Sequence, residues 1–122
     1  MITAQEIQTR LKTFHGSQSY FLCLNPNFLM SEGVHYLAEA AECNWLINAI
    51  PTYIGRFGKR PAFLDLRKTD NRWTLTLTDA DGQVRVTEPV SYCTFPLPEI
   101  KLIIEWSEQC GNKWVIGLPS EH

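Results

Sequence analysis

The sequence predicts one α+β domain, residues 1–122, in which N-terminal helices pack on an antiparallel sheet of four or five strands built from residues 63–118. Two observations predict this class. Before Phe63, apolar residues recur three and four positions apart, which is the spacing of one helix face. From Phe63 onward they alternate with polar residues, which is the period of a strand. With 122 residues, of which 44% are hydrophobic, a single apolar core can hold the chain together.

N-capping residues mark two helix starts. Thr3 and Glu6 have the spacing of a capping box, so they predict a short first helix. Ser31 is a good N-cap for a second helix, the clearest in the chain, because apolar residues follow it at helical spacing. The expected apolar face of that helix consists of Val34, Leu37, Ala38, Ala41 and Trp45. Pro51 lacks an amide hydrogen, so we expect the helical run to kink there or to stop near residue 50.

Turn residues divide the rest of the chain into strands. Asn25, Pro26 and Asn27 predict two short extended pieces within residues 20–30. Prolines at positions 89, 96 and 98 predict a connector, because an interior strand cannot accept so many missing amides. We expect a three-stranded meander before this connector and a C-terminal hairpin after it, with strands at residues 63–67, 73–78, 84–87, 100–106 and 113–118.

The same alternation predicts the residues of the core, with the threonines of the meander on the outer face. The expected core consists of Trp45, Leu46, Ile50, Leu64, Leu66, Leu75, Leu77, Val84, Val86, Leu102 and Ile104.

The chain lacks the sequence features of secreted and membrane-spanning proteins. Its first residues mix polar and apolar side chains, without the basic and apolar regions of a secretory signal. The longest strongly apolar stretches, residues 45–50 and 102–106, are far shorter than the roughly 20 residues that span a bilayer. We therefore expect a cytoplasmic protein that has no membrane partner.

No cluster of residues in the sequence identifies a reaction. The cysteines at positions 23, 43, 93 and 110 form no C-x-x-C pair, so buried free thiols are favoured over a disulfide or a metal site. His35 and Glu39 lie one helical turn apart, and a solvated or hydrogen-bonded helix face is favoured over a metal site there. We assign no catalytic residue, no metal and no cofactor. A small enzyme that uses a Cys/His or a carboxylate site remains an alternative.

Positive charge is concentrated in one segment of a chain whose net charge is −2. Residues 56–72 hold six bases and two acids, whereas residues 73–122 hold three bases and seven acids. Bases with aromatic neighbours can bind nucleic acid through phosphates and stacked bases. The candidate anion-binding or nucleic-acid-binding residues are Arg56, Lys59, Arg60, Arg67 and Arg72. A solvated loop is favoured over such a site, because the overall acidic pI argues against a dedicated DNA-binding protein.

Two windows of the sequence carry a specific pattern, FHGSQSYF at residues 14–21 and SEGVHYLAEAAECNWLINAI at residues 31–50. With looser matches at FPLPEI and LPSE near the end, the pattern resembles a family of small uncharacterised bacterial proteins, some carried on phages or plasmid-like elements. Asn48 stands where that pattern more often has Asp. The resemblance brings no assigned activity and so implies no catalytic residue. By analogy it favours a protein that binds something over one that converts a metabolite.

Together these observations predict a non-enzymatic interaction or regulatory module. Its expected partner is an unidentified protein or a second copy of the chain. We expect self-association to use an edge strand or an apolar patch, because strands such as KLIIEW, residues 101–106, carry few of the charges that protect an exposed edge. The alternatives are the small enzyme and a weak nucleic-acid binder that uses residues 56–72.

Overall fold

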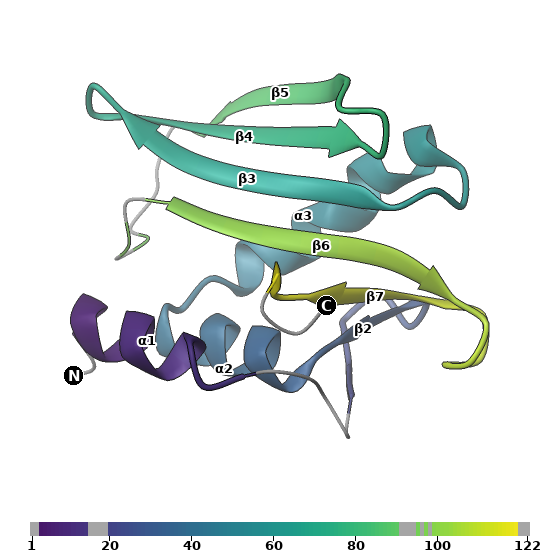
Figure 1. Cartoon of the computed structure of the whole chain (residues 1–122), viewed down its shortest axis with the longest axis horizontal. Coiled ribbons are helices and arrows are strands. Elements are labelled where there is room, and N and C mark those ends of the chain that lie inside the picture. The colour runs from purple at the N-terminus through teal and green to yellow at the C-terminus, as the bar shows by residue number, and fades with distance from the viewer. Residues whose placement is uncertain (1–2, 15–19, 91–94, 96, 98, 120–122) are drawn as a thin grey trace.

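The computed structural model describes residues 3–14, 20–90, 95, 97 and 99–119 and has the predicted α+β architecture (Figure 1). In chain order its elements are α1 (Ala4–Leu11), β1 (Phe21–Leu22), β2 (Phe28–Met30), α2 (Glu32–Ala40), α3 (Asn44–Ile54), the 3-10 helix η1 (Gly55–Phe57), β3 (Ala62–Thr69), β4 (Arg72–Asp79), β5 (Val84–Val90), β6 (Glu99–Ser107) and β7 (Lys113–Gly117). The strands form one sheet, and α3 crosses behind its central strands in the view of Figure 1. None of the described helices has the length and apolar character needed to cross a bilayer.

The sheet has seven strands in the order β1-β2-β7-β6-β3-β4-β5, and it is mixed. The expectation of four or five antiparallel strands is therefore wrong in this detail. β2 pairs parallel with β7, with Phe28 opposite Trp114 and Met30 opposite Ile116, and β1 pairs antiparallel with β2 on its other side. Most of the chain lies between β2 and β7, and a pairing over that distance leaves no periodic signal in the sequence.

The strand that was expected at an edge lies inside the sheet. β6 contains the segment KLIIEW and is flanked by β3 and β7, both of which pair antiparallel with it. Leu102 and Ile104 of this strand are buried. The low charge of KLIIEW therefore reflects burial between two neighbours, and the argument for self-association through this strand is wrong. The two edges of the sheet belong to β1 and β5.

Side-chain caps begin α1 and α2, as the sequence predicts. Thr3 Oγ1 accepts a hydrogen bond from the Glu6 amide at 3.1 Å, and Ser31 Oγ accepts one from the Val34 amide at 3.2 Å. Ser31 is buried, and its own amide donates to the Ile116 carbonyl of β7. The cap of α2 therefore also joins the helical layer to the sheet.

The helical run breaks at Glu42, and α3 then includes Pro51 in its interior. Glu42 has a positive φ of 52°, and the Cys43 amide donates to the Ala38 carbonyl, which is the hydrogen-bond pattern of a Schellman C-cap. The stop expected near residue 50 does not occur. Glycine usually occupies the position that Glu42 holds, so the sequence carries no signal of this helix end.

Of the eleven expected core residues, the structure buries all except Trp45 and Val84. Trp45 is 38% exposed because the break at Glu42 restarts the helix, which takes Trp45 off the apolar face of α2. The connector prolines at positions 96 and 98 lie outside the described residues.

A β-bulge at the start of β5 places Val84 on the outer face of the sheet. Val86 lies opposite Leu77, but Val84 lies opposite Thr78, so Arg85 is an extra residue in β5. Val84 therefore shares the outer face with the threonines of β4 and is 58% exposed. The prediction that Val84 belongs to the core is wrong, because strict alternation does not survive a bulge.

The carboxylate of Asp79 holds the turn between β4 and β5. Its Oδ1 accepts hydrogen bonds from the amides of Asp81 and Gln83, and its Oδ2 accepts one from Arg85 Nε at 2.7 Å. The Arg85 hydrogen bond, followed by those from the two amides, lowers the pKa of Asp79 below its usual value of 3.8. The turn that the predicted strands at residues 73–78 and 84–87 require between them is present, with the left-handed conformation at Gly82.

Replacing Ser31 by Ala is expected to lower the free energy of unfolding by about 1 kcal/mol or more, because the substitution removes a buried N-cap. Urea unfolding followed by circular dichroism measures the change. Thr3→Ala is the control, since it removes the exposed cap of a terminal helix and should cost less. If Ser31→Ala lowers the free energy of unfolding no more than Thr3→Ala does, Ser31 does not link α2 to the sheet as described.

Asp79→Asn should make stability less sensitive to acid. Because the pKa of Asp79 is lower in the folded chain than in the unfolded chain, the carboxylate contributes stability above the unfolded value of 3.8. That contribution is lost as the pH falls through the folded value. Urea midpoints measured between about pH 6 and pH 2 should fall less for the variant than for the wild type. If the urea midpoint falls with pH equally in the variant and in the wild type, the charge of Asp79 does not stabilise the turn.

Candidate functional site

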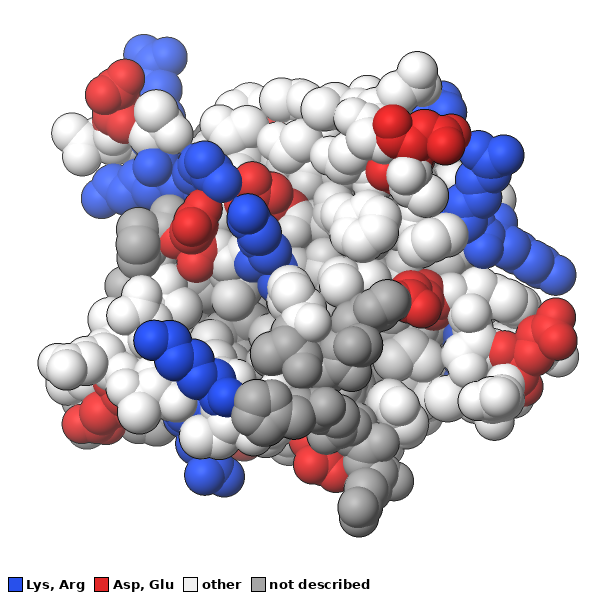
Figure 2. Space-filling view, viewed as in Figure 1, with Lys and Arg blue, Asp and Glu red and all other residues white. Residues whose placement is uncertain are grey.

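The structure divides the predicted anion-binding residues between two ends of the sheet. Lys59 and Arg60 precede β3, whereas Arg67 and Arg72 lie near the turn that joins β3 to β4. Since β3 has eight residues at about 3.3 Å each, the two ends are roughly 25 Å apart. In Figure 2, which has the view of Figure 1, blue side chains gather at the upper left, where β3 turns into β4, and separately at the right, where β3 begins. Arg56 lies in η1, and its side chain is outside the described structure.

Arg67 lies on the outer face of the sheet, where alternation predicts it, and is held by acids. Its Nη2 is 2.8 Å from Glu99 Oε2 and 3.3 Å from Asp65 Oδ2. Two carboxylates beside one guanidinium leave this part of the face without excess positive charge. An incoming phosphate would have to compete with both of them.

The other end of the sheet gathers cations around a small cavity. The cavity has a volume of about 260 Å³ and is lined by Phe57, Gly58, Arg60, Asp79 and Arg85. Arg85 has no place among the sequence-predicted residues, because it belongs to the acidic half of the chain. The feature that places it here is the bulge at the start of β5, which the alternation of the sequence does not reveal.

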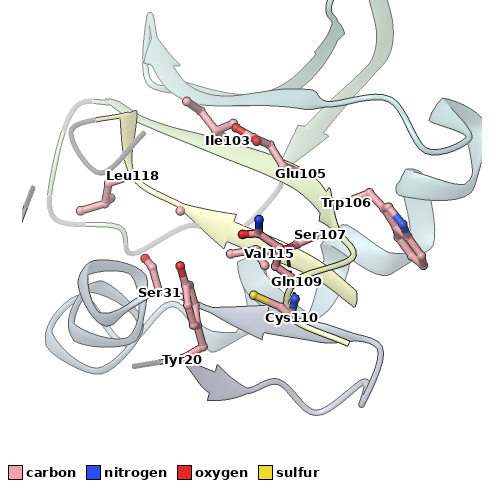
Figure 3. Close-up of a pocket in the computed structure, with 11 residues that line it drawn as sticks. Tyr20, Ser31, Ile103, Glu105, Trp106, Ser107, Gln109, Cys110, Val115 and Leu118 are labelled. Carbon is pink, nitrogen blue, oxygen red and sulfur yellow. Dashed lines mark hydrogen bonds between the residues drawn. The ribbon is translucent and has the colours of Figure 1, made fainter. Parts of the chain in front are cut away.

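A larger cavity of about 390 Å³ lies on the open face of the sheet, at the strands β6 and β7. Figure 3 shows side chains from both strands, from the loop between them and from the N-terminal segment around it, with Trp106 pointing away from the rest. Its lining residues are Tyr20, Ser31, Ile103, Glu105, Trp106, Ser107, Gln109, Cys110, Val115, Gly117 and Leu118. It therefore offers one carboxylate and one thiol, but no imidazole.

His35 lies elsewhere, on α2, and does not line this cavity. Its ring stacks on Phe21 with centroids 3.9 Å apart, and its Nε2 is 3.3 Å from Glu39 Oε1. The predicted helix-face contact between His35 and Glu39 is thus confirmed. A Cys/His pair is not assembled within the described part of the chain.

Two of the described cysteines, Cys23 and Cys43, are buried free thiols, and Cys110 is a half-buried one. Burial raises the pKa of Cys23 to about 11, which keeps its thiol protonated at neutral pH. Cys43 is buried, and its Sγ donates to the Leu37 carbonyl at 3.6 Å. Cys93 lies outside the described residues. Among those that are described, no three His, Cys, Asp or Glu side chains come together as a metal-binding group.

Exposed apolar side chains gather at the β1 edge of the sheet. We call this region the β1 surface, and it comprises Tyr20, Phe21, Leu22 and Leu24. Leu22 is 60% exposed and Leu24 is 84% exposed, the two highest values among the large apolar side chains of the described chain. Sequence reasoning identified the strand but not the surface, because exposure depends on which strand ends the sheet.

A groove separates the β1–β2 hairpin from α3. It has a volume of about 430 Å³, and its lining residues are Leu22, Cys23, Leu24, Met30, Asn44, Ile47 and Asn48. All of these side chains are uncharged. The β1 surface and the groove therefore form a continuous apolar region with a few amide groups beside it.

Comparison with known proteins places the chain in a family and gives it no activity. No curated protein and no solved structure matches the sequence. A model of a family of unknown function, DUF6876, matches residues 5–122. Since this match covers nearly the whole chain, the resemblance to an uncharacterised family is confirmed, and the protein belongs to the family of unknown function DUF6876.

Proposed function

We propose that the protein is a cytoplasmic, non-enzymatic interaction module that acts through the free edge of β1, and that the partner at this edge is a second copy of the chain. The observation that carries the proposal is a contrast between the two edges of the sheet. The β5 edge carries charges, a bulge and a proline, and the described residues of the β1 edge carry none of these three.

The β5 edge is protected. A bulge at Arg85 interrupts its regular backbone, Arg85 and Glu88 add charges, and Pro89 removes one amide donor. β5 continues through Pro89, which the sequence assigned to a connector, because an edge strand tolerates a missing amide. These features are the ones that natural sheets use to avoid pairing edge to edge.

The β1 edge, Phe21–Leu22, is short, but its described residues carry no charge, no bulge and no proline. The segment 20–30 contains no Asp, Glu, Lys or Arg. The Cys23 amide donates to the Phe28 carbonyl of the hairpin at 3.0 Å, so the polar backbone groups of Cys23 face β2. Because these groups alternate along a strand, those of Leu22 face the open edge. An added strand would find a hydrogen-bonding residue there with an exposed apolar side chain.

A second copy fits this edge because the edge is complementary to itself. Antiparallel pairing about a two-fold axis at Leu22 sets Leu22 opposite its own counterpart, so the two residues can exchange both backbone hydrogen bonds. The same axis sets Tyr20 opposite Leu24. These contacts are apolar, and no like charges oppose each other, because the strand carries none.

The sequence resemblance also supports binding over catalysis. The resemblance implies kinship with small bacterial proteins, some of them carried on phages or plasmid-like elements, and small proteins of that character more often bind a partner than convert a metabolite. This support is an analogy between families and adds to the argument from the sheet edges.

Sedimentation at micromolar concentration should give about twice the chain mass of 14.0 kDa for the wild-type protein. Leu22→Lys should be monomeric, because two-fold pairing would bring two lysines together. Val84→Lys is the matched control, since Val84 is 58% exposed and Leu22 is 60% exposed. The control variant should remain dimeric.

Two outcomes would overturn the proposal. One is a monomeric wild-type protein at this concentration, which would leave the β1 edge without a second copy. The other is a Leu22→Lys variant that stays dimeric, which would place the interface on another surface.

A further inference from the structure

We propose that the cavity between residues 55–60 and the turn at residues 79–85 binds a phosphate group. This site is independent of the interaction at β1, since β5 and β1 lie at opposite edges of the sheet. Among the described side chains of the five anion-binding candidates predicted from the sequence, only Arg60 lines this cavity, and Arg85 lines it as well.

Arg85 is oriented by a single strong contact that leaves most of its donors unused. Its Nε is 2.7 Å from Asp79 Oδ2, which fixes the guanidinium at the wall of the cavity. The structure gives its two terminal nitrogens no partner among the described residues, and the side chain is 46% exposed. A guanidinium held in this way has the planar fork of donors that matches two oxygens of a phosphate.

Asp79 does not exclude an anion, although it lines the same cavity. Its two oxygens accept hydrogen bonds from the amides of Asp81 and Gln83 and from Arg85. The carboxylate is 3% exposed and already neutralised by the guanidinium. Its charge therefore holds Arg85 in place and is shielded from a ligand on the solvent side.

Arg60 supplies the second cation and is free to move. Its Nη1 lies 3.5 Å from Asp81 Oδ2, and both side chains are about two-thirds exposed, at 67% and 68%. An ion pair of this length and exposure contributes little to stability. A phosphate in the cavity can therefore recruit Arg60 from Asp81 at low cost.

Two further features suit the approach of an anion. Lys59 Nζ lies 5.0 Å above the centre of the Trp106 ring, which holds a third positive charge near this end of the sheet. Gly58 lines the cavity with a bare backbone at a φ of 62°, a conformation that favours glycine. A ligand in the cavity that the two arginines line can thus come close to the main chain at Gly58.

The test is a titration of the full-length protein, labelled with 15N, with inorganic phosphate and separately with a short single-stranded oligonucleotide. The Arg85 Nε–H and Gly58 amide signals should shift and saturate with at least one of them. Saturation with phosphate alone indicates a small phosphorylated ligand, and saturation with the oligonucleotide alone indicates a nucleic-acid backbone. If neither saturates, the site does not exist.

Two variants that each lose one positive charge distinguish a specific phosphate site from nonspecific electrostatic attraction. Arg60→Ala should weaken binding about tenfold, because it removes one charge-assisted contact. Arg72→Ala removes the same charge at the far end of β3 and should change binding less than twofold. Equal losses in both variants would show that only the overall charge matters and would overturn the proposal.

Arg85→Lys completes the test, because it keeps the charge and removes the fork. Its fold is checked by urea unfolding, since Arg85 also holds the turn. A folded Arg85→Lys variant with wild-type affinity would contradict the role given to the guanidinium.

Discussion

The parallel pairing of β2 with β7 is the constraint on which the rest of the structure depends. The Trp114 amide donates to the Asn27 carbonyl at 2.9 Å, and the Ser31 amide donates to the Ile116 carbonyl at 3.0 Å. Ser31 is also the N-cap of α2, so the residue that ends the pairing begins the helical layer. The pairing joins the start of the chain to its last strand and leaves β1 at the edge of the sheet.

The order of the strands gives the molecule two different edges. One edge is short, apolar and uncharged, and it lies beside the groove along α3. The other edge carries a bulge, a proline and a guanidinium that is fixed by a buried carboxylate. We therefore propose a different partner for each edge, an extended apolar strand at β1 and an anion near the start of β5. Both follow from the topology and not from a local sequence motif.

Local signals predicted the local structure, and long-range contacts decided the rest. Ser31 capped its helix as expected, because a cap involves only the next three residues. The end of that helix at Glu42 escaped prediction, because a glutamate fills a position typical of glycine. Val84 was misplaced because a bulge depends on how two strands pair. The basic residues of the candidate site could be found by composition, but Arg85 could not, since only the folded chain brings it to Arg60.

Hydrogen exchange of the Leu22 amide, measured at several protein concentrations, tests the central claim most directly. This amide faces the free edge of β1, so no strand among the described residues of the same chain protects it. The account predicts slow exchange at concentrations where the dimer forms and fast exchange on dilution, while the Cys23 amide stays protected by Phe28 throughout. Exchange of Leu22 that is equally fast at every concentration would contradict the pairing of β1 with a second copy.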